Sequence, residues 1–352
     1  MQFRTLRIAD LVRETDDCIS LGFDIPAALR AEFAFRPGQY LTLRTYRDGE
    51  ELRRAYSICA GLDDGAVRIA IKRADPGGFS DWANSALRMG DAIDVMPPEG
   101  GFGVQPDPQI ARTILAIAAG SGITPILSIV KSVLAREAGS QVILLYGSRA
   151  TADIIFRAAL EGLKDRYVDR FTLIHVLSRQ TQDIAVLNGR IDAGKLAALL
   201  PGLAVPGDID AAFLCGPADM LDVLPAALQA WGMPAGRIHT ERFTPSGPRR
   251  AVAVAADAPA FAMATIIHDG QTRIVPVAAG EAVLDAALRA GMDLPWSCRA
   301  GMCSTCRARV VAGAVAMTQN FSLEKWETDA GYVLSCQAHP TTGDVTLDYD
   351  HV

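Results

Sequence analysis

Four cysteines near the C-terminus have the spacing of a metal centre. Cys298, Cys303 and Cys306 form a C-x4-C-x2-C group, and Cys336 follows on a later segment. This is the plant-type [2Fe–2S] spacing, in which four thiolates enclose two irons. All-cysteine zinc sites usually combine two short cysteine pairs, whereas only Cys303 and Cys306 form such a pair here. The pattern therefore predicts a [2Fe–2S] cluster rather than structural zinc or four incidental buried thiols.

A second group of residues could hold a flavin nucleotide. Arg54-Ala55-Tyr56-Ser57 offers a cation for a pyrophosphate, an aromatic ring for stacking and a hydroxyl for the reactive N5 edge. A glycine turn follows one predicted strand later, and a turn of this kind before a helix presents free backbone N–H groups to phosphate. The first segment alone would equally fit an ordinary strand. Together the two segments predict a flavin site at Arg54, Tyr56, Ser57, Gly77, Gly78, Phe79 and Ser80.

A third segment has the features of a pyridine-nucleotide turn. A buried strand runs directly into Gly120-Ser121-Gly122-Ile123-Thr124-Pro125, which lacks the third glycine of the dinucleotide fingerprint. Glycines still allow a pyrophosphate to approach, and Pro125 suits a first helical turn. The alternative is a simple strand–turn–helix connection. We predict nucleotide contacts at Gly120, Gly122 and Thr124.

The last predicted strand of this region ends in Cys215-Gly216-Pro217. There the Cys215 thiol could lie beside the nicotinamide, with Gly216 allowing close approach of the nucleotide. The alternative is a turn that only caps the following helix.

The choice between NADH and NADPH depends on charge near the adenosine ribose. A carboxylate would bind a free 2′-hydroxyl, whereas arginine favours a 2′-phosphate. Two predicted strands end in Ser148-Arg149 and Ser178-Arg179, without a carboxylate. Either arginine alone would usually be a solvated surface residue. Together the serine hydroxyls and guanidinium groups predict NADPH.

The elements that must position these residues fall into three regions. Residues 1–104 contain short β-rich runs, such as Gln39–Arg44 and Ala66–Ile71, separated by Gly and Pro turns, which indicates an antiparallel barrel. Residues 105–245 alternate buried strands with helical segments, which indicates a parallel sheet covered by helices. The strands are expected at 113–119, 141–146, 171–177 and 211–215, and the helices at 124–136, 151–163, 193–200 and 218–231.

The C-terminal region is separated from the rest by a segment rich in Ala, Val and Pro. We interpret residues 246–260 as an interdomain linker, because they match no amphipathic period. Residues 261–352 form the predicted cluster domain. It is expected to begin with a hairpin, followed by a helix at Glu281–Ala290 and then by the four cysteines.

The chain has 352 residues, a formal net charge of −6 and seven cysteines. This length suggests two or three domains, and mild acidity is unlike the basic face of a nucleic-acid-binding protein. We identify neither an apolar signal segment nor an apolar run long enough to span a membrane. An odd cysteine count without a secretion signal speaks against a disulfide scaffold, so Cys18 and Cys59 are expected to be buried thiols. We therefore expect a cytoplasmic protein that binds neither nucleic acid nor membrane.

The order of these motifs resembles the ferredoxin–NADP⁺ reductase superfamily fused to a C-terminal plant-type ferredoxin domain. Within that group the chain is most similar to the reductases of phenylacetyl-CoA ring-1,2-epoxidases. The resemblance covers nearly the whole chain and is carried by Leu52–Cys59, Val95–Gly100, Ala116–Pro125, Asn188–Asp192 and His239–Phe243.

The resemblance implies a multidomain protein: a six-stranded antiparallel flavin barrel, an α/β nucleotide-binding domain with a parallel sheet, and a β-grasp ferredoxin domain. It implies FAD as the flavin, nicotinamide contacts near Thr124 and Cys215, and 2′-phosphate contacts at Ser178 and Arg179. The family usually has a Ser-Arg-Glu motif at this position, and this chain has Ser178-Arg179-Gln180. Replacement of the glutamate by glutamine should not remove phosphate binding, but it does not define how Ser178 and Arg179 are arranged.

These cofactors together predict an electron-transfer enzyme. NADPH gives up electrons in pairs as hydride, a [2Fe–2S] cluster takes one at a time, and a flavin can do both. Ser57 would hold the flavin N5 edge and Cys215 the nicotinamide face. The expected partners are the terminal oxygenase subunits of a multicomponent monooxygenase or epoxidase. The alternatives are a reductase for a steroid or aromatic-ring hydroxylase, and a redox-sensing cluster protein without turnover.

Overall fold

The computed structural model describes residues 2–47, 49–74, 76–243 and 259–351, and it divides into two compact units. Residues up to Phe243 form most of one unit, and the described residues from Pro259 onward form most of the other. Nearly all of the predicted linker at 246–260 lies outside the described residues. Ala260 is an exception, because it already belongs to a strand of the C-terminal unit.

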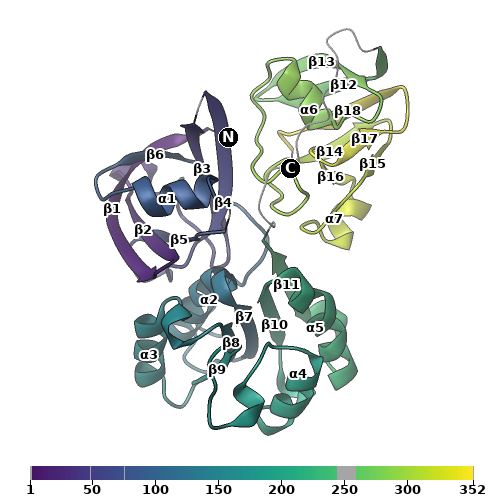
Figure 1. Ribbon diagram of the computed structural model, residues 1–352. Coiled ribbons are helices and arrows are strands. Elements are labelled where there is room, and N and C mark those ends of the chain that lie inside the picture. The colour runs from purple at the N-terminus through teal and green to yellow at the C-terminus, as the bar shows by residue number, and fades with distance from the viewer. Residues whose placement is uncertain (1, 48, 75, 244–258, 352) are drawn as a thin grey trace. The chain divides into compact units, whose positions relative to one another are not determined.

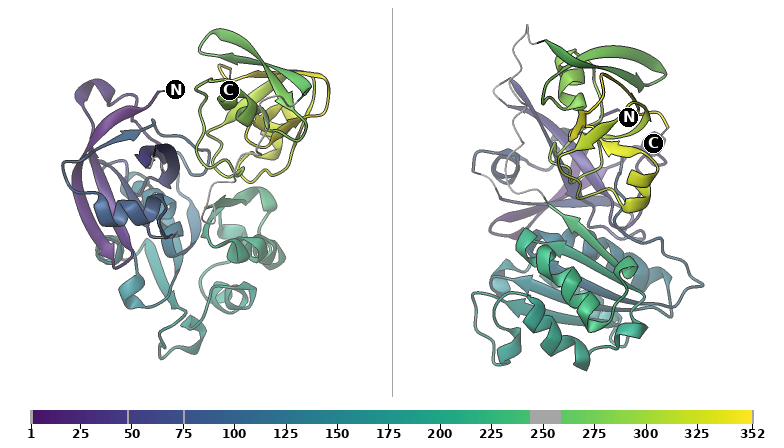
Figure 2. Two further views of the ribbon diagram at one scale, coloured as in Figure 1. Left: turned by 45° about the horizontal axis from the view of Figure 1, so that its top comes forward. Right: turned by 90° about the vertical axis from the view of Figure 1, so that its right-hand side faces the viewer.

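The N-terminal region is the predicted six-stranded sheet, with the order β4-β3-β6-β1-β2-β5. β1 pairs antiparallel with β2 and β6, β2 with β5, and β3 with β6. An antiparallel bridge between Ile58, just after β4, and Ile69 on β5 joins the two ends of the sheet. The strands therefore curve into a barrel (Figures 1 and 2). The elements are β1 (Arg4–Thr15), β2 (Cys18–Asp24), η1 (Ala27–Leu29), β3 (Tyr40–Arg47), β4 (Glu50–Ser57), β5 (Val67–Lys72), α1 (Phe79–Ala86) and β6 (Ala92–Val95).

Two glycines allow two loops of the barrel to pack closely against each other. Gly38 has φ +98°, and a Cβ built there would lie 2.1 Å from the carbonyl oxygen of Phe102. Gly103 has φ +141°, and its Cβ would lie 1.9 Å from the carbonyl oxygen of Pro37. Only glycine fits such backbone contacts without displacing the chain. The turn at 36–39 and the loop at 97–103 therefore pack directly against each other.

The second region is a five-stranded parallel sheet with the order β11-β10-β7-β8-β9. Alternate residues of β7 face opposite sides: Ile114 packs in a core with α2 and α3, whereas Leu115 packs with α4 and α5. Figure 1 shows the two helix pairs on opposite faces of the sheet. The elements are β7 (Thr113–Ala119), η2 (Gly120–Gly122), α2 (Ile123–Arg136), β8 (Gln141–Ser148), η3 (Thr151–Asp153), α3 (Arg157–Arg166), β9 (Phe171–Leu177), η4 (Ala185–Leu187), α4 (Ala193–Leu199), η5 (Leu200–Gly202), η6 (Pro206–Asp208), β10 (Ala211–Gly216), α5 (Ala218–Trp231), η7 (Ala235–Arg237) and β11 (Ile238–Arg242).

The expected strands of this sheet are present, but the helix predicted at 151–163 is wrong in its first half. Residues 151–153 form a 3₁₀ turn, and α3 begins only at Arg157. Between them, Ile154, Ile155 and Phe156 are buried, and Phe156 has φ +61°. The left-handed backbone of Phe156 is incompatible with a continuous right-handed helix, so the chain leaves the helical conformation there. The edge strand β11 was not among the predicted strands.

The C-terminal unit is a mixed sheet with the order β13-β12-β18-β14-β16. β12 pairs parallel with β18 and forms the predicted hairpin with β13. Val283 and Leu284 of α6 pack in one core with Ile266 and Val275 of the hairpin, as in a β-grasp fold. The elements are β12 (Ala260–His268), β13 (Gln271–Ala278), α6 (Val283–Arg289), β14 (Arg307–Ala312), β15 (Val315–Met317), α7 (Lys325–Asp329), β16 (Tyr332–Leu334), β17 (Ala338–Pro340) and β18 (Asp344–Asp348).

Candidate redox sites

The loop between α6 and β14 wraps around Cys298. The backbone N–H groups of Ala300 and Met302 both donate to the Cys298 sulfur at 3.4 Å, and the N–H of Cys298 donates to the Cys303 sulfur at 3.4 Å. Arg299 (φ +53°) and Gly301 (φ +74°) are left-handed, and such turns direct successive N–H groups to one side. The loop therefore presents backbone donors to sulfur.

The four predicted cluster cysteines lie together. Cys303 hydrogen-bonds Cys298 and lowers the pKa of its thiol, and Cys306 does the same for Cys336. Cys303, Cys306 and Cys336 are buried. The hydroxyl of Ser297, next to the first cysteine, is buried without a hydrogen-bond partner among the described residues. Four adjacent sulfurs, two of which accept backbone N–H groups, fit the donor set of a [2Fe–2S] cluster.

The predicted flavin residues lie on two neighbouring segments of the barrel. Arg54, Tyr56 and Ser57 end β4, and the Tyr56 and Phe79 rings lie 5.7 Å apart. The Phe79 side chain is fully buried in the barrel core, so only its backbone can face a nucleotide. Ser80 is also buried, and its hydroxyl accepts the N–H of Ala74 at 3.0 Å.

The glycine turn before α1 has the form expected for a phosphate site. Gly77 has φ +74°, and no atom lies within 4 Å of the position of a Cβ there among the described residues. Gly78 is the N-cap of α1, and no side chain caps the helix among the described residues. The first N–H groups of a helix are available to an anion when no side chain takes them, but the N–H of Gly77 already donates to Asp81 Oδ2 at 3.0 Å.

A half-buried carboxyl group lies beside the predicted hydride-transfer residues. The Ser57 hydroxyl at the end of β4 donates to Glu241 Oε2 at 3.2 Å, and Glu241 on β11 is paired with Cys215 on β10. Burial raises the pKa of Glu241 to about 8, against the lowering effect of the Ser57 hydrogen bond. Burial and the neighbouring Glu241 also raise the pKa of the Cys215 thiol, so this thiol stays protonated. Glu241 therefore brings a titratable group to Ser57 and Cys215.

Sequence reasoning missed Glu241 because its segment, His239–Phe243, was noted only for the family resemblance. The signal available was the short run Ile238–Arg242 after Ala235–Arg237, which forms the edge strand β11. Pairing of Cys215 with Glu241 across β10 and β11 depends on that strand.

The nucleotide turn follows β7 as predicted. Gly120 has φ +54°, and a Cβ on Gly122 would lie 2.1 Å from the carbonyl oxygen of Cys215. The Thr124 hydroxyl donates to the carbonyl of Ser121 at 2.9 Å and thereby closes the first turn of α2. The structure thus brings Gly122, Thr124, Cys215 and Gly216 together at the carboxyl ends of β7 and β10, where α/β sheets bind nucleotides.

The predicted phosphate residues also lie side by side. The N–H groups of Ser178 and Arg179 donate to the carbonyl groups of Ser148 and Arg149 at 2.9 and 2.7 Å. Ser178 and Arg179 are exposed, and within the described ranges the Arg179 guanidinium has no hydrogen-bond or ion-pair partner.

Arg149 differs from Arg179 because its guanidinium already has two carboxylate partners. Its Nη2 lies 2.7 Å from Asp17 and 2.6 Å from Asp153, so it connects the β1–β2 turn of the barrel to η3 of the nucleotide region. Phosphate binding by Arg149 stays a prediction, and it would require exchange of one of these partners. Arg179 is the guanidinium that a 2′-phosphate would meet without such an exchange.

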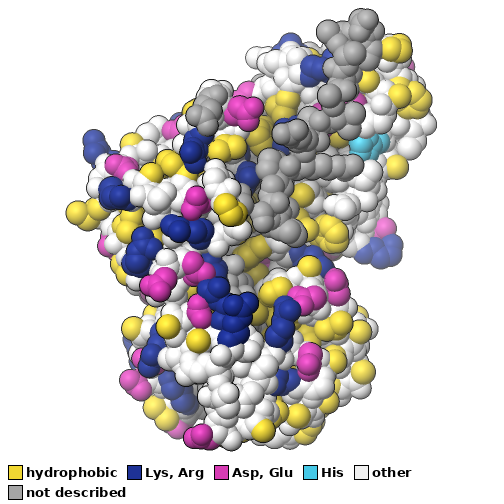
Figure 3. All heavy atoms as spheres, viewed as in Figure 1, with side chains coloured by type: hydrophobic (Ala, Val, Ile, Leu, Met, Phe, Trp, Pro, Cys, Tyr) yellow, Lys and Arg dark blue, Asp and Glu magenta, His cyan; other side chains and the backbone are white. Residues whose placement is uncertain are grey.

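Charged groups outside these sites are mixed in sign. On the face of the flavin and nucleotide unit that Figure 3 draws, Lys and Arg side chains are interspersed with Asp and Glu.

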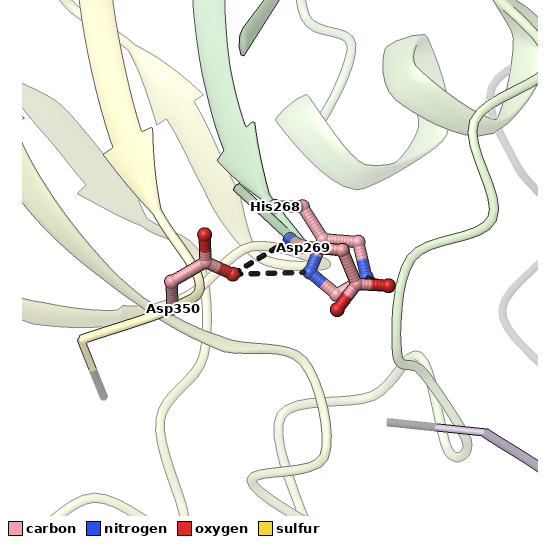
Figure 4. A group of neighbouring side chains, drawn as sticks. All are labelled: His268, Asp269 and Asp350. Atoms are coloured by element: carbon pink, nitrogen blue, oxygen red, sulfur yellow. Dashed lines mark hydrogen bonds and ion pairs between the residues drawn. The ribbon is translucent and has the colours of Figure 1, made fainter. Parts of the chain in front are cut away.

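In the C-terminal unit, His268, Asp269 and Asp350 lie close together (Figure 4). The Asp350 carboxylate accepts the N–H groups of Asp269 and Gly270 at 2.7 and 2.9 Å. This group therefore stabilises the β12–β13 turn.

Comparison with known proteins identifies all three regions. Models of an oxidoreductase FAD-binding domain, an oxidoreductase NAD-binding domain and a 2Fe-2S iron-sulfur cluster binding domain match residues 6–103, 116–224 and 266–341. The chain is 46% identical to a component of the 1,2-phenylacetyl-CoA epoxidase of Escherichia coli, over 99% of this chain and 98% of that protein. The chain belongs to the ferredoxin–NADP⁺ reductase superfamily, in the group with a C-terminal plant-type ferredoxin domain.

Other relatives of the reductase serve different oxygenases. The ferredoxin reductase component of 3-ketosteroid-9-alpha-monooxygenase from Rhodococcus rhodochrous is 34% identical, over 98% of this chain and 96% of that protein. Phthalate dioxygenase reductase has the same fold, with a TM-score of 0.59 and 23% identity over 98% of both chains.

The reductase is thus an oxidoreductase whose three domains bind FAD, NAD(P)H and a [2Fe–2S] cluster. Its fold is the predicted one: an antiparallel flavin barrel, a parallel nucleotide sheet and a C-terminal cluster domain. Within the described residues, no helix is both long and apolar enough to cross a membrane.

Proposed function

We propose that the reductase carries electrons from NADPH through FAD and its [2Fe–2S] cluster, one at a time, to the terminal oxygenase of a phenylacetyl-CoA epoxidase. The observation that carries this proposal is the 46% identity to the Escherichia coli epoxidase component over almost the full length of both chains. FAD supplies the conversion of an electron pair into single electrons that this function needs.

The chain's own residues would bind and orient the two nucleotides. Arg54 and the N–H group at Gly78 would bind the FAD pyrophosphate, and Tyr56 would stack on the ring system. The N–H of Gly77 would join them in exchange for its hydrogen bond to Asp81. Ser57 would hold the N5 edge. The nicotinamide would lie between these groups and the nucleotide turn, with contacts from Gly120, Gly122, Thr124, Cys215 and Gly216.

NADPH is the proposed electron donor because of the charge at the ends of β8 and β9. Ser178 and Arg179 are exposed and Arg179 has no partner among the described residues, which supports their binding a 2′-phosphate. Arg149 would add to this site from the neighbouring strand after exchanging one of its carboxylate partners, and Ser148, whose hydroxyl is buried, would do so only if that hydroxyl became accessible. The absence of a carboxylate in Ser178-Arg179-Gln180 removes the repulsion that a 2′-phosphate would otherwise meet.

The domain boundaries and the compartment belong to the same proposal. We assign residues 1–104 to the flavin domain, 105–245 to the nucleotide domain, 246–260 to a linker and 261–352 to the cluster domain. The three matched family models fall inside these ranges. The three cysteines outside the cluster set, Cys18, Cys59 and Cys215, are free thiols, which fits the reducing cytoplasm.

Reconstitution with purified oxygenase components tests the assignment of the partner. The holo-reductase and NADPH should support turnover of phenylacetyl-CoA by the terminal oxygenase of the epoxidase. The terminal component of a 3-ketosteroid 9α-monooxygenase is the matched alternative partner. Faster product formation with the steroid component than with the epoxidase would contradict the proposed pathway. A protein that does not reduce cytochrome c with NADPH would contradict the electron-transfer function altogether.

A further inference from the structure

Gln337, next to the fourth cluster cysteine, has a fully buried side chain whose polar groups are all engaged. Its amide nitrogen donates to the carbonyl oxygen of Arg299 at 3.1 Å and to the sulfur of Cys336 at 3.5 Å. Its amide oxygen accepts the Thr318 hydroxyl at 2.6 Å. An amide buried without such partners would be costly, so this arrangement holds the side chain in one position.

The partners also decide which way the amide points. The carbonyl oxygen of Arg299 can only accept a hydrogen bond, so the group facing it must be the N–H₂ group of Gln337. The Thr318 hydroxyl then donates to the amide oxygen. Because an N–H₂ group has two hydrogens, it can serve Arg299 and the Cys336 sulfur together.

The amide connects the two segments that hold the cluster. Arg299 follows Cys298 in the first cysteine loop, whereas Cys336 lies between β16 and β17. A Cβ on Gly301 of that loop would lie 3.3 Å from the Gln337 side chain, so the two segments pack closely here. The cluster sulfurs therefore have a side-chain hydrogen-bond donor, Gln337, in addition to the backbone N–H donors of the loop.

We propose that Gln337 raises the reduction potential of the [2Fe–2S] cluster by donating a hydrogen bond to the Cys336 thiolate. Reduction adds one negative charge to the cluster and its ligands, so a donor at a ligand sulfur stabilises the reduced state more than the oxidised state. Gln337 is a positioning residue for electron transfer, and its role does not depend on which oxygenase is the partner.

The variant Gln337→Met tests this proposal, because methionine retains the length of the side chain and removes both N–H donors. We expect the reduced-to-oxidised ratio of the cluster at a fixed potential to fall roughly tenfold, which corresponds to about 59 mV for one electron. The measurement is a redox titration of the full-length holo-reductase, followed by the EPR signal of the reduced cluster. Iron content is determined on the same samples.

Gln319→Met is the matched control, because Gln319 is an exposed glutamine near the first cysteine loop. Its backbone carbonyl oxygen would lie 2.9 Å from a Cβ on Gly301 of that loop. Its cluster should keep the wild-type midpoint. If Gln337→Met does not retain iron, Thr318→Val replaces it. That variant releases the amide oxygen and should lower the midpoint by a smaller amount.

A purely structural role gives a different result. The iron content of Gln337→Met would fall, while the fraction that still holds a cluster would titrate at the wild-type midpoint. That outcome overturns the proposal, and so does an unchanged midpoint in a fully loaded variant. If Thr318→Val is the variant measured, a wild-type midpoint there overturns it as well.

Discussion

At the scale of single residues, two side chains define how the nucleotide site should respond to its ligand and to pH. Arg179 is exposed and, in the described part of the chain, without a partner, whereas Arg149 on the adjacent strand end is held by Asp17 and Asp153. Glu241 is a half-buried carboxyl group that hydrogen-bonds Ser57. These differences could not be inferred from residue type alone.

Replacing Arg179 with alanine should discriminate between the two pyridine nucleotides. Arg179→Ala would remove the proposed charge-assisted hydrogen bond to the 2′-phosphate, so the KM for NADPH should rise about tenfold or more while the KM for NADH changes little. Steady-state reduction of ferricyanide with each nucleotide measures both constants. Arg157→Ala, at an exposed arginine paired with Glu161 on α3, is the control. Equal effects on both KM values would refute the phosphate-binding role.

Glu241 should make the stability of the flavin and nucleotide unit fall as pH rises. Its folded-state pKa of about 8 lies above the ordinary value of 4.5, so between these values the folded protein holds a proton that the unfolded chain releases. Stability is then greatest below pH 4.5 and declines as pH approaches 8. In Glu241→Gln this component is absent, so the variant should gain thermal stability relative to wild type from pH 5 to pH 8. A constant difference in melting temperature over that range would show that Glu241 does not titrate there.

At the scale of elements, η2 approaches β10 closely at the proposed nicotinamide end of the site. Gly122→Ala would place a Cβ 2.1 Å from a backbone oxygen, and backbone cannot move aside as a flexible side chain can. We expect a loss of about 1–3 kcal/mol in unfolding free energy and a higher KM for NADPH.

Gly162→Ala on α3 is the matched control for this substitution, because no described atom lies within 4 Å of its Cβ position. Alanine in a helix interior should stabilise the protein by about 0.5–1 kcal/mol. Urea unfolding of both variants measures the contrast. If Gly122→Ala unfolds at the wild-type urea concentration, the close approach does not constrain the site.

At the scale of the whole molecule, one unit contains the nucleotide region and most of the flavin region, and the other contains the cluster cysteines together with Arg53–Ala55. Cys336→Ser should therefore separate two activities. Reduction of cytochrome c, which needs the cluster, should be lost, whereas NADPH-dependent reduction of ferricyanide through the flavin should remain. Cys18→Ala, at a buried thiol in the core of the other unit, should retain both activities. Loss of both activities in Cys336→Ser would indicate a folding defect or a wrong site.

Much of this protein follows from local sequence. Short-range spacing, hydrophobic periodicity and turn chemistry are properties of neighbouring residues. They were enough to predict the cluster cysteines, the glycine turns, the strands β7 and β9 and the helix α5. The order of the domains follows because each region has its own pattern of periodicity.

Contacts between distant segments required the tertiary structure. Three contacts join residues that are far apart in the chain. Glu241 pairs with Cys215 and also accepts a hydrogen bond from Ser57. Gln337 donates a hydrogen bond to the carbonyl oxygen of Arg299. The break before α3 lies at the left-handed Phe156, a backbone conformation that local helix propensity does not predict. Burial and pairing set the pKa of a carboxyl group and the donors at a sulfur, and both are properties of the packed fold rather than of any segment.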